Sequence, residues 1–156
     1  MSDQQEQPQA QGQFALQRIY LKDASFEVPN SPQVFLAPWQ PEINIQLATE
    51  SKHIEGNNYE VILSLTVTAQ NNGSTAFLVE LKQAGIFLLE NIPDQNLPGL
   101  LGSYCPNILF PFAREAIADI VARGSFPQLL LAPINFDAVM AERQRQMAEE
   151  NTTALQ

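Results

Sequence analysis

The sequence is poor in the residues that build most catalytic and metal sites. Its 156 residues include one cysteine, Cys105, and one histidine, His53. One Cys and one His cannot form a four-ligand structural zinc site, and a Cys–His or Ser–His–Asp site would have to use His53, which lies in a polar run. The glycine-rich phosphate-binding patterns are also missing. We therefore predict no catalytic residue, no metal and no cofactor.

Positive charge and long hydrophobic runs are scarce as well. Eight Lys and Arg residues stand against 17 Asp and Glu residues, which gives a formal net charge of −9. Nucleic acids and anionic membranes are bound by clustered Lys and Arg, so this balance argues against nucleic acid as a partner. Because no apolar run approaches the length of a bilayer span and no signal peptide is recognisable, we expect a cytoplasmic protein without direct membrane insertion.

Both ends of the chain are polar, and the apolar residues lie between them. The first twelve residues are rich in Gln and hold too little apolar surface to offset the entropy lost on folding. The last ten residues have a similar composition. We therefore predict flexible tails at 1–12 and 147–156 around one domain at 13–146.

Alternation of apolar and polar residues predicts a sheet in the first two thirds of the chain. The longest stripe runs from Tyr59 to Ala69, and the other expected strands are 14–28, 42–47 and 75–90. Within 14–28 the apolar residues fall at both even and odd positions, so they do not mark a single strand face. This pattern indicates a bulge or burial on both faces. Four prolines in 29–41 predict an extended crossing loop without regular helix. We expect turns at the polar run 49–58 and at 70–73.

Helical spacing dominates the last third. Apolar residues follow one helical face up to Val121, and Gly124 stands just past the expected helix end. A short helical turn is expected at 97–101, and Asn135 is placed to cap a last helix over 136–146. Strands followed by helices predict an α+β fold, with one antiparallel sheet and the helices packed on one face.

Two groups of apolar residues do not fit a closed core. Leu78 shares a predicted strand face with Glu80 and Lys82, and Ile62 shares one with Glu60; such residues are either singly exposed or part of an interface. The second group lies in proline-rich loops, where it either covers the core or forms an apolar binding groove. Its members are Val34, Phe35, Leu36, Trp39, Phe126, Leu129, Leu130, Leu131 and Ile134.

Several segments between about Phe14 and Ala141 resemble the SecB family of bacterial protein-export chaperones. The most specific is the run YCPNILFPFARE, which spans residues 104–115. Further matching segments are 17–20, 22–30, 39–42, 59–61, 67–69, 126–129 and 131–138.

The resemblance implies a four-stranded antiparallel sheet with two helices, assembled as a homotetramer that is a dimer of dimers. It also implies an ATP-independent holdase that binds unfolded preproteins and delivers them to SecA, the motor ATPase of the Sec translocase. In this family SecA contacts an acidic sheet surface. The matching positions in this chain are Asp23, Glu27, Leu78 and Glu80.

A client-binding groove is expected between the proline-rich loop and the last helices. Its predicted residues are Phe35, Trp39, Phe126, Leu131 and Phe136. Burial of each large side chain by a client contributes about 1.5–3 kcal/mol before entropy costs. Two alternatives remain from other classes of protein: a small-molecule-binding or thiol-dependent enzyme that uses Cys105, and a structural assembly protein without a client.

Overall fold

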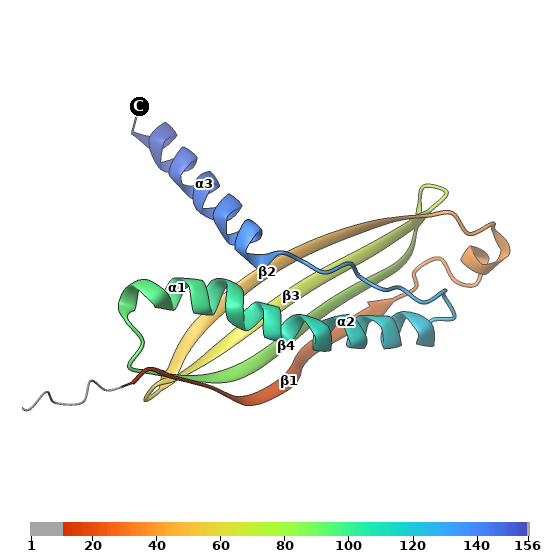
Figure 1. Cartoon of the computed structure of the whole chain (residues 1–156). Coiled ribbons are helices and arrows are strands. Elements are labelled where there is room, and N and C mark those ends of the chain that lie inside the picture. Colours follow the sequence, from red (N-terminus) through yellow and green to blue (C-terminus); the bar gives the residue numbers. More distant parts are fainter. Residues whose placement is uncertain (1–10, 156) are drawn as a thin grey trace, which may run out of the picture.

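The computed structural model describes residues 11–155 and contains one antiparallel sheet of four long strands (Figure 1). The strands are β1 (Gln13–Glu27), β2 (Pro41–Glu55), β3 (Asn58–Asn71) and β4 (Ser74–Glu90). Their order across the sheet is β1-β4-β3-β2. β1 and β2 are therefore the two outer strands, and each has one edge that no other strand of the described chain pairs.

The core lies between the sheet and α2 (Cys105–Arg123), on what we call the inner face. From Val61 to Ala69 the predicted stripe of β3 faces α2 and is buried. On the predicted apolar face of α2, Ala113, Ile117 and Val121 are buried, and the remaining residues are partly buried. A Cβ atom added to Gly85 of β4 would lie 3.0 Å from Cδ2 of Leu109, so glycine lets the helix approach the sheet closely. The expected helical turn before α2 is also present, as α1 (Leu97–Gly99) and a π-type turn (Leu100–Tyr104).

Two bulges in β1 explain its mixed parity. The register shifts between Leu16 and Arg18 and again between Leu21 and Asp23. Each bulge adds one residue, so the side chains beyond it exchange faces. After the second bulge, Phe26 points into the core and Asp23 points to the opposite, outer face, where it pairs in register with Lys82.

β2 is longer than the sequence predicted. It continues to Glu55, so the predicted turn at 49–58 is wrong except at Gly56 and Asn57. His53 therefore lies in a strand, opposite Tyr59. The far end of β2 is exposed on both faces, so no apolar stripe marks it as a strand. The proline-rich loop also holds one 3-10 turn, at Gln33–Leu36, where no regular helix was expected.

α3 (Phe136–Ala154) begins where the sequence predicted, with Asn135 Oδ1 accepting a hydrogen bond from the backbone N–H of Ala138 at 3.1 Å. The α+β fold with two helices is thus confirmed, but only α2 packs along the sheet. α3 projects away from it, because most of the helix is polar and only Phe136 of it is buried (Figure 1). It also passes the predicted end at 146 and continues through most of the predicted C-terminal tail.

The predicted N-terminal tail lies almost wholly outside the described residues, of which Gln11 and Gly12 alone belong to it. Within residues 11–155, no helix combines the length and apolar character needed to cross a membrane.

Candidate binding surfaces

The five predicted groove residues differ in exposure. Phe35 is 48% exposed and Trp39 is half-buried. Phe126, Leu131 and Phe136 are only 7%, 4% and 3% exposed, so the expectation that they line an open groove is wrong. The reason is that residues 124–135 return from the end of α2 to the start of α3, so that Phe126 and Leu131 of this segment and Phe136, the first residue of α3, pack into the core. These three side chains therefore lie beneath the protein surface and are not part of it.

Phe35 and Trp39 sit on one of these buried residues. The ring centroids of Phe35 and Trp39 each lie 5.3 Å from that of Phe126, and Phe126 in turn lies 5.0 Å from Phe77 of β4. These spacings are those of tilted, packed aromatic pairs. The four residues, which we call the aromatic cluster, extend from the core to the surface, with Phe126 as the floor beneath the two loop residues.

A second apolar surface lies on the inner face of β2 and was not among the predicted site residues. Ile43 and Ile45 are 39% and 42% exposed, and Leu47 is half-buried. They are uncovered because α2 packs on β3 and β4 and leaves β2 open. We call these three residues the β2 strip. Their alternation identified the strand, but the sequence did not show that the helix would leave this face free.

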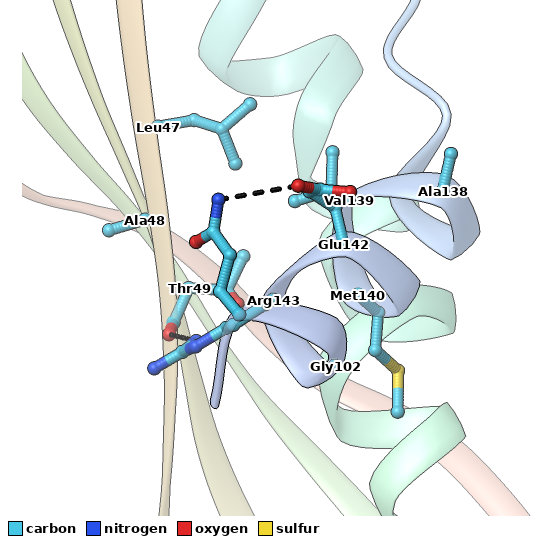
Figure 2. Close-up of a pocket in the computed structure, with 10 residues that line it drawn as sticks. Leu47, Ala48, Thr49, Gly102, Ala138, Val139, Met140, Glu142 and Arg143 are labelled. Carbon is cyan, nitrogen blue, oxygen red and sulfur yellow. Dashed lines mark hydrogen bonds between the residues drawn. The ribbon is translucent and has the colours of Figure 1, made fainter. Parts of the chain in front are cut away.

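A cleft of about 610 Å³ continues the strip between β2 and the first half of α3 (Figure 2). Leu47 and Thr49 face Val139 of α3 across it, and Nη1 of Arg143 donates a hydrogen bond to the Thr49 carbonyl at 3.2 Å. The full lining is Leu47, Ala48, Thr49, Gly102, Ala138, Val139, Met140, Glu142, Arg143 and Gln146. Most of this lining is apolar, as in sites that bind apolar ligands.

Residues 39–49 pass in turn through the aromatic cluster, the β2 strip and this cleft, and we call the three surfaces together the apolar trough. From Trp39 to Leu47 the chain rises about 26 Å at the usual spacing of a strand. An extended polypeptide of about eight residues has the same length. The trough therefore has the dimensions of a site for an unfolded chain segment.

The four residues matched to SecA contacts come together on the outer face of the sheet. Glu27 of β1 lies opposite Leu78 of β4, and two residues further along Ser25 lies opposite Glu80, with Asp23 next in line. The three carboxylates are exposed and Leu78 is half-buried. We call Asp23, Glu27, Leu78 and Glu80 the outer-face acidic patch.

Ile62 was expected to be exposed on this face, and it is buried. It lies in register with Ala84, which in turn lies opposite Tyr20. Tyr20 donates a hydrogen bond to Glu60 across β4, and this bridge passes beside Ile62. An interface role for Ile62 therefore has no support.

The same Glu60 carboxylate anchors the second bulge of β1. Nζ of Lys22, the extra residue of that bulge, lies 2.8 Å from Glu60 Oε1. Hydrogen bonds from Lys22 and Tyr20 hold the pKa of Glu60 below its ordinary value. Burial, with a smaller contribution from Glu60, raises the pKa of Tyr20 to about 12, so the phenol stays a donor at neutral pH. The bridge thus fixes the bulge that turns Asp23 outward.

Cys105 lies at the start of α2 and is completely buried. Burial raises the pKa of its thiol to about 12, and the thiolate is the reactive form of cysteine. We expect a dithiobis-nitrobenzoate reagent at pH 7 to label the folded protein much more slowly than the urea-unfolded protein. Equal rates in the two states would contradict this and would favour the thiol-dependent alternative.

Comparisons with known proteins agree with the resemblance in the sequence. A family model described as preprotein translocase subunit SecB matches residues 4–147. This chain belongs to the SecB family. It is 59% identical over 138 residues to the protein-export protein SecB of Nitrosococcus oceani, with 87% of this chain and 84% of the relative covered. The SecB of Hahella chejuensis is 51% identical over 155 residues, covering 99% and 97%.

A solved SecB-like structure has the same fold. It is a SecB-like chaperone of Mycobacterium tuberculosis in complex with a ChAD peptide from the HigA1 antitoxin, and it aligns with a TM-score of 0.65. The alignment covers 78% of this chain and 90% of that chain at 17% sequence identity. The family predicted from YCPNILFPFARE and the other segments is confirmed.

Proposed function

We propose that this SecB-family chain is an ATP-independent chaperone that holds unfolded preproteins in the apolar trough and delivers them to SecA. The observation that carries the proposal is the β2 strip, a row of uncovered aliphatic side chains between an aromatic cluster and a cleft. A contiguous exposed apolar surface in a folded protein is typical of a binding site. Its length and open shape suit an extended chain better than a compact small molecule.

Client binding in the trough is a sum of weak contacts. An unfolded preprotein offers extended apolar segments, and each large side chain that is fully buried contributes about 1.5–3 kcal/mol before entropy costs. Several troughs on one assembly bind the same chain through effective concentration, so no single contact has to be tight. Such binding needs no nucleotide, and it is reversible when a second protein takes over the client.

SecA is the proposed second protein, and the outer-face acidic patch is its proposed contact. The patch and the trough lie on opposite faces of one sheet, so a client and SecA can be bound at the same time. Charged contacts at exposed sites mainly set the encounter rate and the salt dependence of binding. We expect association with SecA to weaken as ionic strength rises, whereas client binding changes little.

Other apolar surfaces support assembly as a homotetramer made of two dimers. The outer strand β1 carries two exposed residues, Leu16 and Leu21. Phe112 is exposed on α2, and Tyr104 is exposed just before that helix begins. Open strand edges and exposed apolar helix faces are surfaces that proteins usually cover. A second copy at each surface covers both. We further propose a cytoplasmic, non-enzymatic protein, in keeping with the buried thiol of Cys105 and the family of the chain.

The division into two surfaces is tested by Glu80→Lys. This reversal places a positive charge within the acidic patch and leaves the inner face unchanged, so SecA binding should fall strongly while client binding stays near that of the wild type. Titration calorimetry with SecA and with reduced, alkylated ribonuclease A measures the two affinities separately.

Glu55→Lys is the matched control. Glu55 is exposed at the far end of β2, remote from β1 and Leu78, and its reversal changes the net charge equally. We expect it to affect SecA binding only slightly. If both variants lose SecA binding equally, the loss comes from the change in net charge and not from the acidic patch. If Glu80→Lys loses SecA binding and client binding equally, the two surfaces are not separate.

A further inference from the structure

Asn71 is a buried polar residue at the junction between the proline-rich loop and the sheet. It is 3% exposed and is the last residue of β3, in register with Pro41, the first residue of β2. Proline has no backbone N–H, so the pairing of β2 with β3 cannot continue into the loop through Pro41 or Pro38. The side chain of Asn71 makes hydrogen bonds to the loop at this point instead.

The carboxamide of Asn71 holds the backbone on both sides of Trp39. Its Nδ2 donates to the carbonyl of Pro38 at 3.0 Å, and its Oδ1 accepts from the N–H of Gln40 at 2.9 Å. Asparagine is the smallest side chain with a donor and an acceptor at this spacing. Removal of either hydrogen bond leaves a buried polar group unsatisfied, so the two contacts strongly restrain the loop.

Trp39 is the residue whose position depends on these two hydrogen bonds. Its indole packs on Phe126 and is partly exposed, at the end of the trough where Ile43 follows. Phe35 packs on the same Phe126 ring from the loop, so an indole displaced from Phe126 disrupts the exposed half of the aromatic cluster. A large side chain that is already ordered before binding loses less entropy when a client contacts it.

We propose that Asn71 is a positioning residue for client recognition: by fixing the backbone at Pro38 and Gln40, it holds Trp39 on Phe126 in the conformation that receives a client's apolar side chains. The proposal rests on the proposed function, since it concerns the same trough. Asn71 itself does not touch the client. Its contribution is transmitted through Trp39 alone.

The test uses the fluorescence of Trp39, which is the only tryptophan in the chain. In Asn71→Ala we expect stronger acrylamide quenching and red-shifted emission of the assembled protein without client. Affinity for reduced, alkylated ribonuclease A should fall about three- to tenfold, the effect of ordering one large side chain on binding. Gln70→Ala is the control, because Gln70 is the exposed neighbour on the other face and should change neither reading.

Two further variants separate positioning from general damage. In a Trp39→Ala background, Asn71→Ala should weaken client binding no further, because the two residues act through one contact. Asn71→Asp keeps the acceptor for Gln40 and loses the donor to Pro38, so it should give an intermediate quenching; it replaces Asn71→Ala if that variant does not fold.

The outcomes distinguish this inference from the proposed function. Unchanged acrylamide quenching of Trp39 in both Asn71 variants overturns the inference. Increased quenching with unchanged client affinity also overturns it. So does a further loss of client affinity when Asn71→Ala is added to Trp39→Ala. None of these results affects the proposed function as long as the wild type binds the client. If the wild type does not bind it, the proposed function fails, and the recognition role of Asn71 fails with it.

Discussion

Ile45→Asp is expected to weaken client binding about tenfold without unfolding the protein. Ile45 is the middle residue of the β2 strip and is partly exposed, so its replacement removes little of the core. It does remove one large apolar contact with the client and places a carboxylate where the client's apolar side chains must pack. The lower end of the range for burying one such side chain, about 1.5 kcal/mol, corresponds to a roughly tenfold change in affinity.

The adjacent residue provides the control for this variant. Gln46 lies on the outer face of the same strand, so Gln46→Asp adds the same charge one residue away on the opposite side of the sheet. We expect it to bind reduced, alkylated ribonuclease A as the wild type does, and both variants to show wild-type circular dichroism. Similar affinities for the two variants in titration calorimetry would mean that the client does not lie on the β2 strip.

Phe126→Ala is expected to lower the free energy of unfolding by about 3–5 kcal/mol, the range for a phenylalanine removed from a packed core. Phe126 is in contact with the rings of Phe35, Trp39 and Phe77, so the deletion leaves a cavity that three rigid aromatic side chains cannot easily fill. A loss of this size is a large part of the 5–15 kcal/mol that stabilises a typical domain.

Leu130→Ala is the matched change in the same segment. Leu130 is 68% exposed, and its truncation should alter the free energy of unfolding by only about 0.5 kcal/mol or less. Urea unfolding followed by circular dichroism gives both values. If Phe126→Ala is no more destabilising than Leu130→Ala, then residues 124–135 do not pack into the core, and Phe126 is available to bind clients directly as first predicted.

Much of the fold followed from the sequence because its strongest patterns report burial on one face. The stripe of β3 and the apolar face of α2 were both predicted, since each packs against the other and has the period of its own secondary structure. Asn72 and Gly73 were predicted as a hairpin turn and have φ of 53° and 79°. The bulges in β1 were indicated by parity alone.

Other features depend on tertiary context that no local pattern contains. The far end of β2 is polar because nothing covers it, and it therefore resembled a turn. The sequence predicts Gly124 as the usual glycine after a helix, but its φ is −83° and Ser125 has the positive φ of 68°. A Cβ on Gly124 would lie 2.5 Å from Phe26, so this glycine is required for space and not for backbone conformation.

The two candidate surfaces differed in how far they could be predicted. The four acidic-patch positions came from the family resemblance, and the register of β1 with β4 places them together on one face of the sheet. The trough was only half predicted: Phe35 and Trp39 are at the surface, while Phe126, Leu131 and Phe136 are buried. An apolar residue in a non-periodic segment gives no sign of which way it points. Asn71 was missed because asparagine next to Asn72 and Gly73 resembles one more turn residue.

The central claim is that the trough is a site for unfolded polypeptide, and light scattering after size exclusion tests it most directly. We expect the protein alone to have the mass of four 17.3 kDa chains, and that mass to increase by one client on addition of reduced, alkylated ribonuclease A. Native ribonuclease A, with the same sequence but a closed core, should leave the mass unchanged. No increase with the unfolded form, or an equal increase with both forms, would contradict the account.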